Sequence, residues 1–172
     1  MKTENVKEKI LDLLFDFPTR KFHIREISKI IKISAPAVSN NIKNLEKDDL
    51  IVHNRGFISE IYVKMSNKFK ALKRIHNLKK IYESGLEDHL TEGFPLATIV
   101  LFGSYSRGED TEKSDIDIAI FGREKRLGIE VFEKRLNRRI NIEFVRFSKI
   151  SPELKESIIN GIVLSGDITQ ND

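Results

Sequence analysis

One segment, Leu101–Phe121, constrains the fold of this chain more than any other. It reads LFGSYSRGEDTEKSDIDIAIF, in which a polar turn separates two apolar runs. The apolar runs are typical of buried strands, which we place at 97–102 and 116–121. Side chains alternate along a strand, so Asp115 and Asp117 share one face while Ile116 and Ile118 share the other. The segment therefore predicts a strand–turn–strand unit that presents two carboxylates together.

Paired carboxylates on one strand face are suited to hard cations that bridge the phosphates of a nucleoside triphosphate. Gly103, directly after the first strand, permits a close approach of backbone to ligand. Ser104, followed by a predicted helix start, offers a hydroxyl and amide groups to phosphate oxygens. Arg107 is placed to neutralise phosphate charge. We therefore predict that Asp115 and Asp117 bind metal and that Gly103, Ser104 and Arg107 bind nucleotide.

A third strand, predicted at 140–147, supplies another acid. Alternation places Asn141, Glu143 and Val145 on one face and Ile140 and Ile142 on the other. A third carboxylate beside such a pair can complete a site for two hard cations and can accept a proton from an attacking hydroxyl. Our hypothesis is that Glu143 is this third ligand and base.

The order Gly103-Ser104, ten residues, then Asp115-x-Asp117 resembles the signature of the DNA polymerase β-like nucleotidyltransferases. The resemblance covers about residues 86–165 and includes the Arg107-Gly108 of small stand-alone members. It implies a two-metal Mg²⁺ site and transfer of a nucleoside monophosphate from an NTP, with ATP expected, to an acceptor. Family members usually carry Asp where Glu143 stands, and Glu is one methylene longer. Stand-alone relatives often act as antitoxins, some by adenylylating a partner protein.

The charges differ between the two halves of the chain. Residues 1–80 hold 18 Lys and Arg against 9 Asp and Glu, whereas residues 81–172 hold 12 against 17. A basic front half attracts a polyanion, and an acidic back half is expected where carboxylates hold metal ions. Two solvated surfaces of chance composition are the alternative interpretation.

The front half, residues 1–65, resembles a winged helix-turn-helix domain. Apolar spacing predicts three helices, followed by a hairpin that turns at Arg55-Gly56. The helices are expected at 5–17, 23–31 and 35–47. In the second helix Ile24, Ile27, Ile30 and Ile31 are expected to face inward. Asp49 stands where such domains often carry Gly in a left-handed turn.

The third helix buries Val38, Ile42 and Leu45, so its opposite side is free to contact a ligand. Short polar groups near a helix start reach base edges, and Lys and Arg pair with phosphates. The predicted DNA-binding residues are Ser39, Asn40, Lys43, Asn44, Lys47 and Arg55. Winged helices also bind proteins or RNA, and these alternatives remain open at this stage.

Between the halves, residues 66–91 are expected to form a helical linker in which Gly85 marks a kink or a break into two helices. Residues 92–172 would then be the nucleotidyltransferase domain. The expected fold class is α+β: a winged helix of three helices and a β-hairpin, a helical linker, and a mixed β-sheet with flanking helices. The apolar side of the linker could pair two chains into a homodimer or pack on its own domain.

The sequence argues against several other classes. Without Cys there is no disulfide and no thiolate zinc site, and the cytoplasm is the expected location. We find no apolar run of membrane-spanning length, no export signal and no P-loop pattern. The expected protein is thus a DNA-binding, Mg-dependent nucleotidyltransferase that acts as a transcriptional regulator or antitoxin. Its acceptor is unknown, and a protein is one candidate. The alternatives are a non-catalytic winged-helix regulator that senses a nucleotide, and an enzyme whose winged helix docks a protein or RNA substrate.

Overall fold

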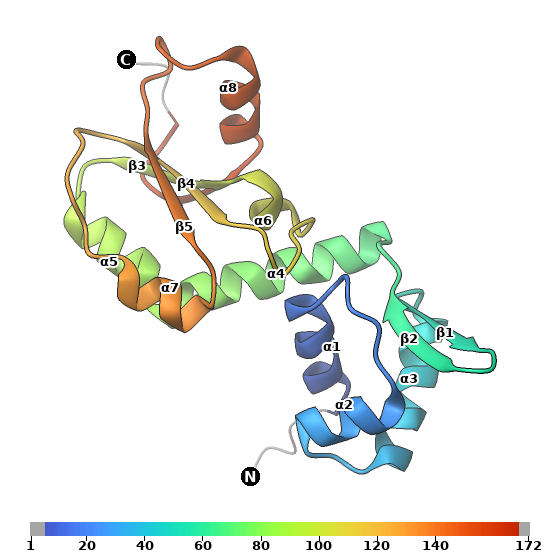
Figure 1. Cartoon of the computed structure of the whole chain (residues 1–172). Helices are drawn as coiled ribbons and strands as arrows, with labels where there is room; N and C mark the ends of the chain where they lie inside the picture. The colour runs from blue at the N-terminus through green and yellow to red at the C-terminus, as the bar shows by residue number, and fades with distance from the viewer. Residues whose placement is uncertain (1–5, 169–172) are drawn as a thin grey trace. The chain divides into compact units, whose positions relative to one another are not determined.

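The computed structural model describes residues 6–168 and divides the chain into two compact units (Figure 1). The division falls between Lys73 and Arg74. This point lies inside helix α4, Asn67–Ser84. Within the stretch expected as a linker, Phe69 belongs to the core of the first unit and Ile81 to the core of the second. Each unit is described by itself below.

The first unit contains three helices and an antiparallel hairpin. Its elements are α1 (Val6–Asp16), α2 (Ile24–Ile31), α3 (Ala35–Lys47), β1 (Ile51–Arg55) and β2 (Ser59–Val63). The three expected helices and the hairpin are confirmed as elements, while residue 5 lies outside the described part of the chain. The expected turn at Arg55-Gly56 was wrong, because Arg55 still pairs with Ser59 and the chain turns at 56–58. Phe22, between α1 and α2, exchanges two backbone hydrogen bonds of 2.8 Å with Ile61 of β2. The hairpin is therefore extended by a third, single-residue bridge.

The core of the first unit is built from one stripe of each helix. Val38, Ile42 and Leu45 of α3 are fully buried, as expected. The inward placement of Ile30 was wrong, because its side chain is 46 % exposed. A helical period of 3.6 residues puts Ile24, Ile27 and Ile31 close to one line and leaves Ile30 at the edge of that stripe.

Asp49, in the connection from α3 to β1, adopts a left-handed backbone conformation. Asp49 has φ +63°, a conformation that costs an ordinary L-residue roughly 1 kcal/mol. Two contacts hold it there: its carboxylate accepts a hydrogen bond from Lys64 Nζ at 2.6 Å, and its carbonyl accepts one from Ser66 Oγ at 3.0 Å. The turn expected at Asp49 thus forms without glycine.

The second unit is a four-stranded sheet with helices on both faces. After α4 its elements are α5 (Leu86–Gly93), β3 (Thr98–Phe102), α6 (Gly103–Arg107), β4 (Ile116–Phe121), α7 (Glu130–Leu136), β5 (Ile140–Phe144), α8 (Pro152–Ile159) and β6 (Ile162–Ser165). Gly85, with φ +79°, separates α4 from α5, so the break into two helices is the outcome.

The strand order is β5-β4-β3-β6, which makes the sheet mixed, as expected. β4 pairs parallel with β5, whereas β3 pairs antiparallel with both β4 and β6. Because β4 and β5 are parallel, their first residues lie at the same end of the sheet. That end receives Asp115 and Asp117.

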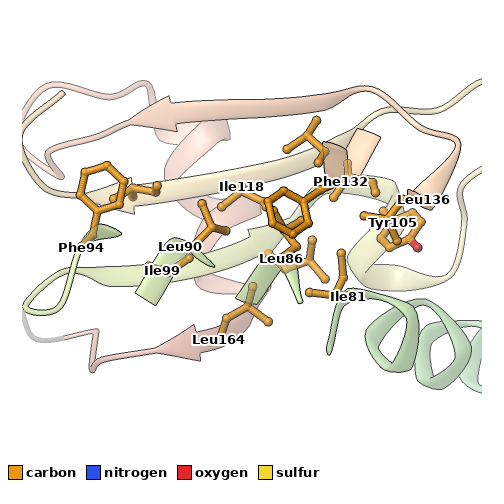
Figure 2. Close-up of a cluster of buried hydrophobic side chains, with 14 of the residues drawn as sticks. Ile81, Leu86, Leu90, Phe94, Ile99, Tyr105, Ile118, Phe132, Leu136 and Leu164 are labelled. Atoms are coloured by element: carbon orange, nitrogen blue, oxygen red, sulfur yellow. The ribbon is translucent and has the colours of Figure 1, made fainter. Parts of the chain in front are cut away.

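Alternation along the strands gives the two faces of the sheet different cores. Figure 2 shows Ile99 and Ile118 of the sheet packed among Leu86 and Leu90 of α5 and Phe132 of α7. The opposite face packs Val100, Phe102, Ala119 and Val145 against Ile158 of α8. Asp117 belongs to this second face, where the sheet is only partly covered.

None of the helices within residues 6–168 is both long and apolar enough to cross a membrane.

Candidate active site

The turn after β3 brings backbone against a carboxylate. Gly103 follows the last residue of β3 and has φ +74°, in the left-handed region. A Cβ built at Gly103 would collide with Oδ2 of Asp117. Glycine is therefore required twice, by the backbone conformation and by the close approach of Asp117. The half-buried Ser104 comes next and lies beside this contact in sequence.

The two acids of the Asp-x-Asp pair lie at the start of β4. Asp115 directly precedes the strand and Asp117 is its second residue, and both side chains are half-buried. Between them, Ile116 is fully buried in the core on the other face. Strand alternation thus anchors the pair through its apolar neighbours and leaves the carboxylates accessible to solvent.

The neighbouring strand β5 brings its own polar residues to the same face. In the parallel register Asp117 is opposite Asn141, and Ala119 is opposite Glu143. The amide nitrogen of Asn141 lies 3.3 Å from Oδ1 of Asp117 and 3.5 Å from Oε1 of Glu143. One amide therefore stands between the two carboxylates and donates to both.

The sequence alone places Asn141 on the same strand face as Glu143 but assigns it no role in the site. The signal was its position two residues before Glu143, on the face shared with the acids. Recognising its contact with Asp117 required the strand register, because a shift of one residue would have turned it into the core.

The donor set fits a hard divalent cation, although it is not preassembled. Within residues 6–168 no three His, Cys, Asp or Glu side chains are gathered closely enough to hold a metal ion. The Asp117 and Glu143 carboxylates nevertheless meet at one amide, and oxygen ligands of this kind are those that Mg²⁺ prefers. Glu143 stands two register positions beyond Asp117, and its carboxylate reaches back to within 3.5 Å of the Asn141 amide.

Arg107, predicted to bind phosphate, is the last residue of α6 and is engaged locally. Its Nε donates to Oε2 of Glu109 at 3.0 Å, and its side chain is 44 % exposed. An exposed ion pair of this type is worth about 0–1 kcal/mol, so a phosphate could displace Glu109.

A buried polar cluster holds the loop that leads from α6 to β4. Asn77 of α4 donates to the carbonyl of Tyr105 at 2.9 Å and to Oδ1 of Asp110 at 2.7 Å. Arg138, ahead of β5, lies 3.7 Å from Oδ2 of Asp110 and donates to the carbonyl of Thr111. Asp110 is 1 % exposed, so this charge is stabilised by partners rather than by water. Sequence reasoning missed the cluster because its members come from separate segments.

The other predicted contact surface lies on α3, in the first unit. Asn40, Lys43, Asn44 and Lys47 are exposed, and within residues 6–168 their side chains have no hydrogen-bond or ion-pair partner. Ser39 is half-buried.

Arg55, the sixth predicted DNA-binding residue, pairs with Glu46 of α3. The contacts are Nη2–Oε2 at 2.5 Å and Nη1–Oε1 at 3.0 Å. This fork holds the pKa of the Glu46 carboxyl below its ordinary value and raises that of the guanidinium.

Comparison with known proteins relates the second unit to a protein family. Residues 85–167 match the family described as polymerase beta, nucleotidyltransferase. A protein of Methanocaldococcus jannaschii, provisionally named a protein adenylyltransferase, is 31% identical over 102 residues. This match spans 55% of the present chain and 97% of that protein. No solved structure matches the chain significantly.

Proposed function

Because the chain belongs to the polymerase β-type nucleotidyltransferases, we propose that it transfers a nucleoside monophosphate from an NTP, with ATP expected, to a hydroxyl group of an acceptor. The observation that carries this proposal is the convergence at one end of the sheet. There the Gly103 turn touches Asp117, and Asn141 joins Asp117 to Glu143.

The roles of the residues follow from their positions. Asp115, Asp117 and Glu143 would hold magnesium, which supplies charge neutralisation to the phosphates when bound. Ser104 and the Gly103 backbone would bind phosphate oxygens, and Arg107 would leave Glu109 to join them. Glu143 would accept the proton of the acceptor hydroxyl. The hydroxyl oxygen bonds to the α-phosphorus while the α–β phosphoanhydride bond breaks, and pyrophosphate departs.

A protein is the proposed acceptor class. The support is the name of the M. jannaschii relative, which describes a protein adenylyltransferase and which the present chain covers almost completely. A macromolecular acceptor would also complete a site that is shallow in this unit, where Asn141 is exposed.

For the first unit we propose a winged helix that binds DNA. The order of three helices and a hairpin supports it, as does the bridge from Phe22 to Ile61. The face of α3 that carries Asn40, Lys43 and Asn44 has side chains available for bases and phosphates. Residues 1–80 hold 18 cationic and 9 anionic side chains, and this positive balance favours a polyanionic partner. The proposed biological role is that of a regulator or antitoxin, acting as a homodimer on its DNA.

A second candidate is a regulator that binds a nucleotide without transferring it. It is favoured by one feature: Glu stands in the third acidic position. In this case the same end of the sheet would bind NTP but release it unchanged.

Transfer is tested by incubating the protein with Mg²⁺ and labelled ATP, alone and with lysate of its source cells. We expect an acceptor whose mass rises by one nucleoside monophosphate. The increase should vanish when the protein carries Asp115→Asn together with Asp117→Asn. Label that transfers equally with the double variant would refute the assignment, and saturable ATP binding without transfer would favour the sensor.

DNA binding is tested separately by its salt dependence. Affinity should fall steeply with salt, and Lys43→Ala should reduce the log–log slope by about one. Lys79→Ala, which removes the same charge from the exposed side of α4, serves as the matched control. Equal slopes for the two variants would argue against α3 as the DNA-contacting helix.

A further inference from the structure

A cluster of cations lies where β4 and β5 end, opposite the end that carries Asp115. After β5 the chain turns tightly, and the amide of Lys149 donates to the carbonyl of Arg146 at 2.9 Å. This turn brings Arg146 and Lys149 close together, and Arg123 follows the neighbouring strand β4. All three side chains are exposed.

The backbone that presents these cations is held in place by packing. The amide of Val145 donates to the carbonyl of Ile120 at 3.0 Å, which prolongs the β4–β5 pairing. The ring of Phe147 lies 4.7 Å from that of Phe121, and Lys155 Nζ sits 5.1 Å from the Phe147 ring centre. The cations therefore project from a preorganised surface.

Two adjoining cavities open between the cations. One has a volume of about 370 Å³ and the other about 360 Å³, and both are lined by Arg123 and Arg146. Ser148 lines the first, and Lys149 lines the second. Volumes of this size are in the range of small-molecule sites.

The positive charge around these cavities is not compensated by the protein. Arg123, Arg146 and Lys149 form no ion pair with any side chain in the described stretch, 6–168. Glu124 is the one acid among the residues that line the second cavity. Three cations around a hollow repel one another and create a positive potential that a bound anion would relieve.

A third, apolar cavity adjoins the two cavities that the cations line. It has a volume of about 540 Å³ and is lined on one side by Phe94, Pro95, Leu96 and Ala97. Arg123 also lines it, so the apolar and cationic hollows share a wall. Leu96 is fully exposed, which is unusual for a large aliphatic side chain without a partner.

We propose that this end of β4 and β5 binds a phosphate-bearing small molecule with an apolar body, the chemistry of a free nucleotide. The phosphates would contact Arg123, Arg146 and Lys149, and the ring system would enter the cavity beside Leu96. Phe121 lies four positions after Asp117 along β4, so the two sites lie on the order of 13 Å apart along the strand. The inference does not depend on catalysis at the acidic end.

Calorimetry with ADP as the probe, in EDTA, tests the proposal. Without magnesium the carboxylates at the acidic end repel phosphate, so binding there is suppressed. We expect ADP to bind the wild-type chain, and Arg123→Ala with Arg146→Ala to weaken binding about tenfold or more. Arg126→Ala removes the same charge from the same loop, at a residue outside the three linings, and should leave affinity unchanged.

Further variants and a second ligand distinguish this site from binding at the acidic end and from binding of phosphate alone. Asp115→Asn with Asp117→Asn should retain ADP binding, because it alters only the acidic end. Pyrophosphate should bind more weakly than ADP, since it cannot fill the apolar cavity, and Leu96→Asp should remove this difference. The proposal is overturned if ADP does not bind, if the two Arg changes leave its affinity intact, or if pyrophosphate binds as tightly as ADP. Thermal unfolding of each variant verifies that the surface changes leave the fold intact.

Discussion

The two ends of the β4–β5 pair carry opposite charge. Asp115 and Asp117 lie at the beginning of β4, and the amide of Asn141, near the beginning of β5, contacts both Asp117 and Glu143. Beyond the ends of the same strands, Arg123 and Arg146 line neighbouring cavities. The acids belong to the strands or adjoin them directly, whereas the cations belong to the turns.

This difference separates two ways of building a site. Strand alternation fixes which face an acid occupies, and the buried Ile116 between the two aspartates enforces it. The cations depend on how each turn folds back, which requires contacts such as that between Phe121 and Phe147. A site on a strand is specified by local sequence, and a site on turns is specified by tertiary packing.

The largest effect should come from the acidic end. Asp115→Asn with Asp117→Asn preserves shape but removes two charges, and we expect transfer to fall by about 10³-fold or more. Labelled transfer from ATP is the measurement. ADP binding at the cationic end should persist, which would establish that the two ends act separately. Glu83→Gln with Asp88→Asn, on exposed helix positions, is the control for loss of charge alone.

Gly103→Ala should affect both stability and transfer. The positive φ costs an alanine about 1–2 kcal/mol, and the new methyl group must displace Asp117. We expect a lower melting temperature and a loss of transfer of roughly 10²-fold, as for a misplaced catalytic group. Gly128→Ala lacks the positive φ and should change neither quantity. A wild-type rate in Gly103→Ala would mean that Asp117 does not need its observed position.

Changes at Asn141 should alter the magnesium dependence of transfer. Asn141→Ala removes the group that joins Asp117 to Glu143, and we expect kcat or magnesium affinity to fall about 10-fold. Asn141→Asp adds an oxygen ligand directly opposite Asp117 and should lower the magnesium concentration needed for half-maximal rate. Initial rates across a magnesium titration give both quantities. Identical titrations for all three proteins would show that Asn141 plays no part at the acidic end.

The smallest effect is expected from the lone acid of the cationic cavities. Glu124→Gln removes one compensating charge at an exposed position, and ADP should bind roughly two- to fivefold more tightly. Raising the salt concentration should shrink that gain, since exposed charges are screened. Weaker ADP binding by Glu124→Gln would indicate that Glu124 contacts the ligand rather than opposing it.

Much of the second unit could be predicted from local sequence. The positions of β3 and β4, the face of Asp117 and Glu143, and the break at Gly85 follow from alternation and from glycine. The Asn77–Asp110–Arg138 cluster could not be predicted, because its members meet only when α4, the loop and the chain ahead of β5 are folded. The pairing of Arg55 with Glu46 also escaped sequence reasoning, since it depends on how the hairpin folds back to α3.

In the first unit, spacing predicted the helices but misjudged a boundary position. Ile30 is as hydrophobic as a core residue, yet the rotation of 100° per residue places it at the edge of the buried stripe of α2. The left-handed turn at Asp49 was expected at the correct position. The contacts with Lys64 and Ser66 that accompany it became visible only with the hairpin in place.

Strand β5 stands outermost in the order β5-β4-β3-β6, so Glu143 projects from the periphery of the sheet. A substitution there would disturb little of the packed interior, in contrast to one at Gly103. Over evolutionary time the third acid can therefore be gained, exchanged or lost while the scaffold survives unchanged. Proteins descended from one such ancestor are therefore free to diverge into active transferases and into proteins that bind a nucleotide without transferring it.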